Sequence, residues 1–172
     1  SPYHAAAISD GFDEVRIDLP ENLRRLSSAP LFSAPGEAFR YSLSIDVLGA
    51  VIEKATGKRL QAAVAELVTE PLGMKDTSFL ATAPSRLAAP YYDARPVPAL
   101  MSDKQAIPFG EGQLTYVPSR VFDANAYPSA GSGMVGTAPD VMRLLEAIRK
   151  GGKPILNAPT ATSMMRNHIG SL

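Results

Sequence analysis

Prolines crowd one stretch of this chain and limit what that stretch can fold into. Seven of the 15 prolines lie between residues 80 and 136, at positions 84, 90, 96, 98, 108, 118 and 128. Proline lacks a backbone N–H and fixes φ, so no long helix can run through this stretch. Alternation of apolar and polar residues survives only in short pieces such as 113–117, which predicts one small strand. An irregular stretch of this length is typical of a functional loop, or of a segment that another part of the protein covers.

Three helices are predicted before the proline-rich stretch, because apolar residues there recur at helical spacing next to start and stop signals. The helices run from Asp18 to about Ser27, from Ser42 or Ser44 to Gly57, and from Leu60 to Pro71. In the middle helix, the face expected to be buried consists of Val47, Leu48, Val51, Ile52 and Ala55.

Two more helices are predicted after the proline-rich stretch. One begins at Thr137, which resembles the first residue of a capping box, and ends before Gly151. The other begins at Asn157, and its Met164 and Met165 are expected to fill the core. The chain is therefore predicted to be one mainly α region with at most short strands. Its predicted segments are helical (1–80), Pro/Gly-rich loop (81–136) and C-terminal helices (137–172).

The composition excludes several classes of function. Lys and Arg together number 17, as do Asp and Glu, and no basic stripe is present, so we expect no nucleic-acid partner. No apolar run approaches about 18 residues, so no membrane span is predicted. Cysteine is absent, and His4 and His168 have no metal-ligating neighbours at useful spacing. We therefore expect neither a metal nor another cofactor, and interpret both histidines as solvated or capping residues.

The common catalytic signatures are also missing. No serine has glycines at the spacing of a nucleophile elbow, and two histidines near opposite ends make a Ser-His-Asp triad implausible. No phosphate loop, dinucleotide fingerprint or H-E-x-x-H motif occurs. The early carboxylates are interpreted as a solvated acidic loop. They are Asp10, Asp13, Glu14 and Asp18.

The Tyr41-Ser42-Leu43-Ser44 sequence stands directly before the most regular apolar pattern. A tyrosine with its usual pKa of about 10 is a poor base at neutral pH. A nearby cation that stabilises the phenolate would allow it to take a proton from a serine hydroxyl. Arg40 is the adjacent cation. From the residues alone, a half-buried tyrosine packed against the helix start is the favoured interpretation.

Residues 39–58, FRYSLSIDVLGAVIEKATGK, resemble the Tyr-Ser-x motif and following helix of the serine β-lactamase-like superfamily. This superfamily includes class C β-lactamases, D-Ala-D-Ala carboxypeptidases and family VIII esterases. Further blocks resemble it in the right order, and the similarity, greatest to the EstB-type esterases, covers nearly the whole chain. These blocks are EPLGMKDTSF, PSRVFDANAYPSAGSGMVGTAPDVMRLLEAIRKGG and MMRNHIG. The resemblance implies a helix-rich subdomain of the α/β β-lactamase/transpeptidase-like fold.

Two motifs of that superfamily are missing here. The Ser-x-x-Lys that supplies its catalytic serine and lysine occurs nowhere in the sequence. The late Lys-Thr-Gly, His-x-Gly or Trp-Gly-Gly strand is absent too, since residues 56–58 read Thr-Gly-Lys. We therefore expect a central fragment of a larger hydrolase, inactive alone. Apolar surface left uncovered in such a fragment is expected to cause self-association.

The resemblance also implies roles for particular residues. Tyr41 would be the general base or acid acting on the parent's serine. Leu43 stands where β-lactamases of this family carry asparagine, which implies esters with an apolar acyl group. Asp46 could support the site by accepting a hydrogen bond, although a carboxylate interacting with the helix dipole explains it equally well. Tyr127 resembles a pocket-lining tyrosine, and the substrate-binding residues implied beside it are Gly131, Ser132 and Gly133.

Three functions remain open at this point. The first is part of a serine carboxylesterase that acts on a small-molecule ester through an acyl-enzyme. The second is part of a β-lactamase or D-Ala-D-Ala carboxypeptidase with a β-lactam-like substrate. The third is a non-catalytic, penicillin-binding-like module. The sequence does not indicate a compartment.

Overall fold

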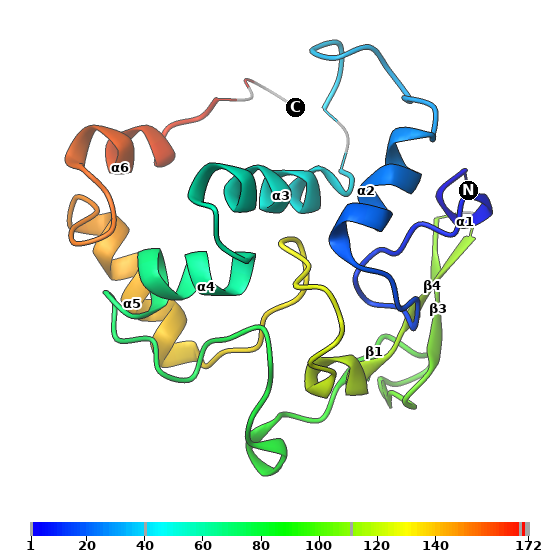
Figure 1. Cartoon of the computed structure of the whole chain (residues 1–172). Helices are drawn as coiled ribbons and strands as arrows, with labels where there is room; N and C mark the ends of the chain where they lie inside the picture. The colour runs from blue at the N-terminus through cyan, green and yellow to red at the C-terminus, as the bar shows by residue number, and fades with distance from the viewer. Residues whose placement is uncertain (1, 40, 111, 169, 171–172) are drawn as a thin grey trace. The chain divides into compact units, whose positions relative to one another are not determined.

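The computed structural model describes residues 2–39, 41–110, 112–168 and 170. The chain divides into two units, each assembled from two separate stretches of sequence. Figure 1 labels the α-helices of both units. The first unit comprises Ser1–Leu60 and Phe79–Met134, and the second comprises Gln61–Ser78 and Val135–Leu172.

The helices of the first unit are α1 (Pro2–Ala5), α2 (Leu19–Ser27) and α3 (Ser44–Thr56). Helix α2 begins as predicted, because the Asp18 carboxylate accepts a hydrogen bond from the Glu21 N–H at 2.9 Å. Helix α3 also ends as predicted, at Gly57, which has a φ of 68°.

The face of α3 that is buried differs from the predicted one. Asp46 and Gly49 are the buried residues of this helix, whereas Val47, Leu48 and Val51 are 39%, 50% and 56% exposed. A Cβ on Gly49 would lie 3.0 Å from the Ala130 Cβ and 3.2 Å from the Leu60 Cδ2, so the missing side chain allows close packing there. Periodicity identified the residues that share the apolar face of α3. It did not specify that the rest of the chain packs on another face.

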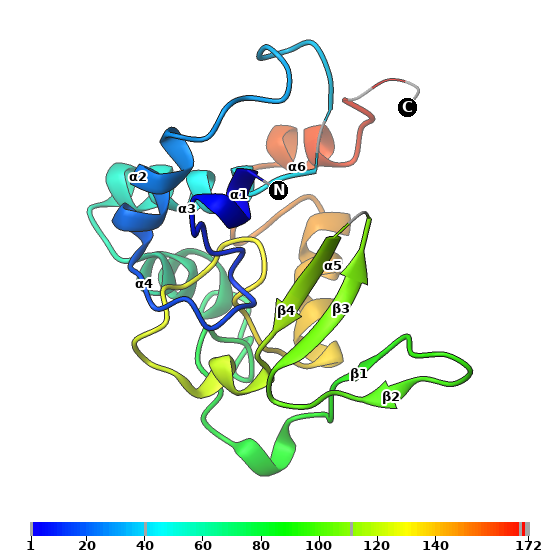
Figure 2. The same cartoon turned by 90° about the vertical axis from the view of Figure 1, so that its right-hand side faces the viewer.

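The prediction that the chain is mainly α is wrong, although its strands are short, as predicted. The proline-rich stretch contains two antiparallel hairpins, β1 (Tyr91–Tyr92) with β2 (Ala99–Leu100) and β3 (Gln105–Phe109) with β4 (Gly112–Tyr116) (Figure 2). Pro108 lies inside β3, opposite Gln113. Both strands of a two-stranded sheet are edge strands, where a missing N–H is tolerated, so the proline density did not exclude this hairpin. The small strand predicted at 113–117 is confirmed as β4.

Two backbone hydrogen bonds connect the segments next to the hairpins to other parts of the first unit. The Val117 N–H donates to the Phe12 carbonyl at 2.8 Å, and the Ala81 N–H donates to the Val121 carbonyl at 2.8 Å. Two 3₁₀ turns, η2 (Pro84–Arg86) and η3 (Pro118–Phe122), begin at prolines.

The second unit contains most of α4 (Leu60–Val64), the π-helical turn η1 (Ala65–Thr69), α5 (Ala138–Arg149) and α6 (Ala158–Met164). The Thr137 hydroxyl accepts from the Asp140 N–H at 3.4 Å, and the Asn157 amide oxygen accepts from the Thr160 N–H at 2.9 Å. Both predicted helix starts are therefore confirmed. Met164 and Met165 are 57% and 58% exposed, so their assignment to the core was wrong.

A buried carboxylate joins two stretches of the second unit. Asp140, 1% exposed, accepts hydrogen bonds from the Asp76 N–H at 2.8 Å and from the Thr77 hydroxyl at 2.9 Å, and it pairs with Arg143. Ser78 and Val135 form a β-bridge beside it. No helix within the described ranges is both long enough and apolar enough to cross a bilayer.

Candidate functional site

Tyr41 lies at the start of α3 and is 91% exposed, so it is not the half-buried residue that the sequence favoured. It forms no hydrogen bond with any other described residue, and Arg40, its expected cationic neighbour, lies outside the described residues. The Ser42 hydroxyl accepts from the Ser44 N–H at 3.2 Å, and the two serine hydroxyl oxygens are 2.8 Å apart. The backbone next to the phenol is therefore fixed by the hydrogen-bonded Ser42–Ser44 turn, while the phenol itself faces solvent; the N-cap residue of α3 is Leu43, so neither serine caps the helix as predicted.

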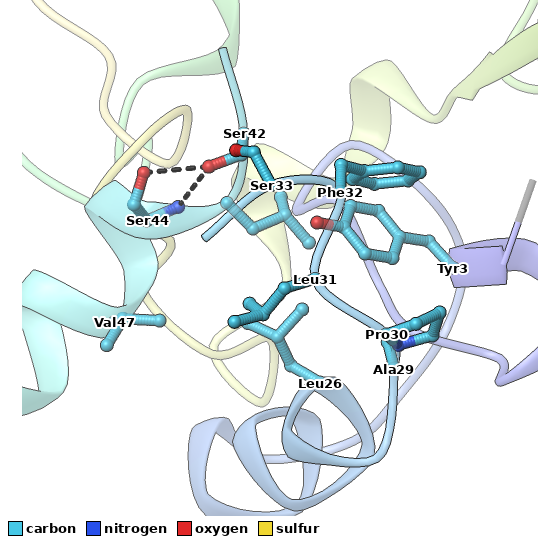
Figure 3. A pocket seen from close by; sticks show the side chains of 11 residues that line it. Tyr3, Leu26, Ala29, Pro30, Leu31, Phe32, Ser33, Ser42, Ser44 and Val47 are labelled. Atoms are coloured by element: carbon cyan, nitrogen blue, oxygen red, sulfur yellow. Dashed lines mark hydrogen bonds between the residues drawn. The ribbon is translucent and has the colours of Figure 1, made fainter. Parts of the chain in front are cut away.

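Leu43 precedes the first residue of α3 and lines a pocket in the first unit. This pocket has a volume of about 230 Å³ and lies between the end of α2, the loop at 29–33 and the first turn of α3 (Figure 3). The side chains in Figure 3 are aliphatic and aromatic, apart from three serines. Leu43, two residues after Tyr41, is thus part of an apolar wall.

Asp46 anchors the loop that follows Tyr127. Its carboxylate, 3% exposed, accepts a hydrogen bond from the Ser129 hydroxyl at 2.8 Å and one from the Gly131 N–H at 3.3 Å. Because the Ser129 proton goes to Asp46, the Ser132 hydroxyl is the donor in the 2.9 Å contact between the two serines. A hydrogen-bonded chain therefore joins the first turn of α3 to residues 129–132.

The two glycines of this loop occupy different environments. A Cβ on Gly133 would lie 2.7 Å from the Ser129 carbonyl oxygen and 2.8 Å from the Ser129 nitrogen, both backbone atoms. A Cβ on Gly131 would lie 3.8 Å from the Ile45 Cβ, which is ordinary contact. Gly133 therefore lets the loop fold back on itself, whereas Gly131 is exposed.

Tyr127 is 4% exposed, and its hydroxyl lies in a buried polar cluster. The hydroxyl accepts from the Asn22 amide at 3.1 Å and donates to the Ser9 carbonyl at 3.5 Å. Asn22 also donates to that carbonyl at 3.0 Å and accepts from the Ser9 N–H at 2.9 Å. Burial raises the pKa of the Tyr127 phenol, and the charge on Asp46 raises it further. Tyr127 is therefore held neutral, unlike a phenol suited to transfer protons.

A cation lies over the Tyr127 ring. The Arg120 guanidinium carbon is 5.3 Å from the ring centroid, and Nη1 donates to the Asp13 carbonyl at 3.1 Å. Its Nη2 is buried with no hydrogen-bond partner among the described residues. The guanidinium and the Ser9–Asn22 pair fix the orientation of the tyrosine ring.

Tyr116 is a second phenol near Tyr41 that the sequence did not single out. Burial raises the pKa of Tyr116, and the charges on Asp10 and Tyr41 raise it further. Its ring packs against Phe12 with centroids 4.6 Å apart. Burial also raises the pKa of Asp10, so the early carboxylates are not simply a solvated loop.

The structure brings some of the expected site residues together and leaves others apart. Asp46, Gly131 and Ser132 meet through Ser129, while Tyr41 makes no hydrogen bond to them. Ser9, Asn22 and Ser129 were missed, because polar residues in irregular chain carry no periodic signal. The sequence contained one signal for Ser129. It is one of two serines in the segment Pro128-Ser-Ala-Gly-Ser-Gly, which directly follows a tyrosine.

No group of three or more His, Asp or Glu side chains within the described part of the chain is arranged to hold a metal ion. The His168 Nε2 lies 2.7 Å from the Ser163 carbonyl oxygen in the last turn of α6, so this histidine is a capping residue. The side chain of His4 lies outside the described residues.

The chain belongs to the beta-lactamase family, whose model matches residues 2–170. It is 54% identical over 152 residues to esterase EstB of Burkholderia gladioli, covering 87% of this chain and 39% of that protein. It is 44% identical over 55 residues to the D-alanyl-D-alanine-carboxypeptidase/endopeptidase AmpH of Escherichia coli K12, covering 31% of this chain and 14% of AmpH.

A solved structure matches the whole chain. EstCE1, described as a hydrolase with promiscuous acyltransferase activity, superposes with a TM-score of 0.93 at 42% identity, covering 99% of this chain and 46% of EstCE1. Proteins of this fold are α/β, which also overturns the mainly α prediction. This chain spans less than half the length of EstB and of EstCE1.

Proposed function

We propose that this chain is part of a serine carboxylesterase, to which it contributes Tyr41 as the proton-transfer group and a wall of the substrate pocket. The observation that carries the proposal is the position of Tyr41, 91% exposed and three residues before the first residue of α3, in a chain 54% identical to an esterase. A phenol that acts on a serine from another stretch of polypeptide has to be exposed on the surface that carries it.

The proposed reaction proceeds through an acyl-enzyme. Tyr41 as phenolate takes the proton of the serine hydroxyl while the serine oxygen attacks the ester carbonyl, and it then gives that proton to the departing alcohol oxygen. In the second half, water attacks the acyl-serine, Tyr41 takes the proton from water, and the serine oxygen recovers it as the acid leaves. The net reaction is ester plus water to acid plus alcohol.

Two features of the site support distinct roles for the two tyrosines. The pKa of Tyr127 is raised by burial, and its hydroxyl is already engaged with Asn22 and Ser9. Tyr127 therefore shapes the wall, while Asp46 keeps the following loop, with Gly131, Ser132 and Gly133, against α3.

These 172 residues contain no Ser-x-x-Lys, so we expect them to be inactive by themselves. The test is the protein encoded by the complete reading frame, assayed with p-nitrophenyl butyrate. Tyr41→Phe should lower kcat by about 10²- to 10⁴-fold with little change in KM. Tyr91→Phe is the matched control, since Tyr91 is also exposed and lies in β1. An unchanged kcat for Tyr41→Phe would disprove the proposed role.

A second candidate function is part of a D-Ala-D-Ala carboxypeptidase or β-lactamase. The match to AmpH, whose name describes a D-alanyl-D-alanine-carboxypeptidase/endopeptidase, supports it. Leu43 argues against it, because leucine cannot supply the amide hydrogen bond of the asparagine that β-lactamases carry there. Assaying the same protein with a chromogenic cephalosporin and with D-Ala-D-Ala peptide separates these functions. Turnover of either substrate above that of the ester would favour the second function.

A further inference from the structure

The pocket beside the Ser42–Ser44 turn has no part in the proton transfers of the proposed reaction. It is lined by Leu26, Leu31, Phe32, Leu43 and Val47, with the hydroxyls of Ser42 and Ser44 at one side (Figure 3). Its volume of about 230 Å³ exceeds the roughly 150 Å³ of an engineered apolar cavity that binds benzene. It is smaller than the 300–1,000 Å³, approximately, of a site for a drug-sized ligand. The pocket therefore fits one apolar group rather than a whole large molecule.

The lining specifies a neutral ligand. None of the 11 described residues around the pocket carries a charge. A charged group placed there would lose hydration without gaining an opposite charge, whereas an alkyl or small aromatic group would be removed from water at no such cost. Leu31 and Phe32 are 77% and 55% exposed, so a ligand would cover apolar surface that is now in contact with water.

The serines add a polar contact at the rim. Ser42 and Ser44 have two hydroxyl protons between them, and their mutual contact at 2.8 Å uses one. The Ser44 N–H also donates to the Ser42 oxygen, at 3.2 Å. Within the described residues, one hydroxyl proton thus remains to donate to a ligand oxygen. In Figure 3 both hydroxyls lie on the same side of the lining, with Val47, Leu26 and Leu31 below them.

We propose that this pocket binds the apolar group of a neutral ester substrate, a short alkyl chain or a small ring, with the ester oxygen at the Ser42–Ser44 hydroxyls. This deepens the proposed function and depends on it for the identity of the ligand as a substrate. The pocket wall follows Tyr41 directly in the chain, so a group held there would place its ester next to the turn that presents the phenol.

Binding can be tested on the 172-residue chain without any catalysis. Methyl alkyl ketones from 2-butanone to 2-decanone are probes that carry an ester-like carbonyl and are not hydrolysed. In an NMR titration we expect affinity to rise with chain length and then level off when the pocket is full. Hexanoate and hexylammonium should bind at least about tenfold more weakly than 2-octanone, because the lining has no charge to pair with them.

The matched variants are Val47→Phe and Val51→Phe, which lie one turn apart on α3 and are both exposed. Only Val47 lines the pocket. Val47→Phe should shorten the chain length at which affinity levels off and weaken 2-octanone binding about tenfold, while Val51→Phe should leave both unchanged. If Val47→Phe misfolds by circular dichroism, Leu31→Ala replaces it, and it should weaken binding several-fold.

Three results would overturn the inference. They are equal binding of the charged and neutral probes, equal effects of the two phenylalanine variants, and pocket signals that shift on dilution while no ketone binds. The last result would mean that a second copy of the chain occupies the pocket. Ketone binding as described, combined with full activity of Tyr41→Phe in the complete protein, would refute the proposed role of Tyr41 but leave the pocket established.

Discussion

The carboxylate of Asp46 accepts a hydrogen bond at 2.8 Å from the hydroxyl of Ser129, a residue 83 positions later in the chain. Both partners are nearly inaccessible to solvent, at 3% and 1% exposure. This contact fixes the loop after Tyr127 against the first turn of the helix that begins beside Tyr41. The first turn of α3 and the loop after Tyr127 are therefore joined by one buried carboxylate.

Replacing Asp46 should destabilise the first unit. Asp46→Ala leaves the buried Ser129 hydroxyl without its carboxylate acceptor and removes the acceptor of the Gly131 N–H, so we expect a loss of about 2–3 kcal/mol in the free energy of unfolding. Asp46→Asn keeps one acceptor oxygen and should lose about 1 kcal/mol. Urea denaturation of the chain measures both.

The control for these variants is Asp93→Ala. Asp93 is exposed, so its replacement should change the free energy of unfolding by less than about 0.5 kcal/mol. Equal stability of Asp46→Ala and Asp93→Ala would show that the buried carboxylate does not hold the loop.

Gly131 and Gly133, which lie two residues apart in the loop after Tyr127, provide a test of the loop geometry. Alanine at position 133 would place its Cβ 2.7 Å and 2.8 Å from backbone atoms of Ser129, which cannot move away as a flexible side chain could. Gly133→Ala should therefore lower the melting temperature by several degrees, the equivalent of about 1–3 kcal/mol. Gly131→Ala should be tolerated, because its closest contact would be 3.8 Å. A larger effect at 131 than at 133 would contradict this loop geometry.

Ends of helices were predictable because the signals that set them are local. Asp18, Thr137 and Asn157 cap helices as predicted, and Gly57 ends α3 with a positive φ. Each of these signals acts within about four residues of itself, so it can be read from a short stretch of sequence.

Burial was predicted less well, because it depends on what lies opposite a residue. The apolar stripe of α3 indicated a core face, yet the chain packs on the side of Asp46 and Gly49. The hairpin β3–β4 was hidden by its proline, which an edge strand tolerates.

The residues of the candidate site show the same difference between local signals and distant contacts. Residues near a recognisable motif, such as Tyr41 and Leu43, could be proposed from sequence. The partners Ser9, Asn22 and Ser129 could not, since their contacts join residues 13 to 118 positions apart.

An exposed ion pair gives a prediction for pH. Hydrogen bonds from Arg24 and then Arg25 lower the pKa of the Glu21 carboxyl from 4.5 to about 2. Because the pKa is lower in the folded state, the stabilisation from this group is fully present above pH 4.5 and is lost as the pH falls towards 2. An NMR titration of the Glu21 side chain should therefore give a midpoint well below that of a free glutamate.

Salt and a double variant serve as controls for the Glu21 titration. High ionic strength screens exposed charges, so the midpoint should rise with added NaCl. Arg24→Gln combined with Arg25→Gln should raise it further, towards the ordinary glutamate value. A midpoint that is ordinary from the start and insensitive to salt would contradict the ion-pair geometry.

Exposed apolar residues on α3 predict that the isolated chain associates with itself. Leu48 and Val51 are 50% and 56% exposed, and burying such side chains against a second copy removes apolar surface from water. Light scattering should give a mass of at least two chains for the unmodified sequence. Val51→Lys combined with Leu48→Lys should shift the mass towards one chain, because a lysine ammonium resists burial without a partner. Asp93→Lys adds the same charged group at an exposed position in the same unit and should leave the association unchanged. A strictly monomeric unmodified chain, at every concentration measured, would show that this face does not drive association.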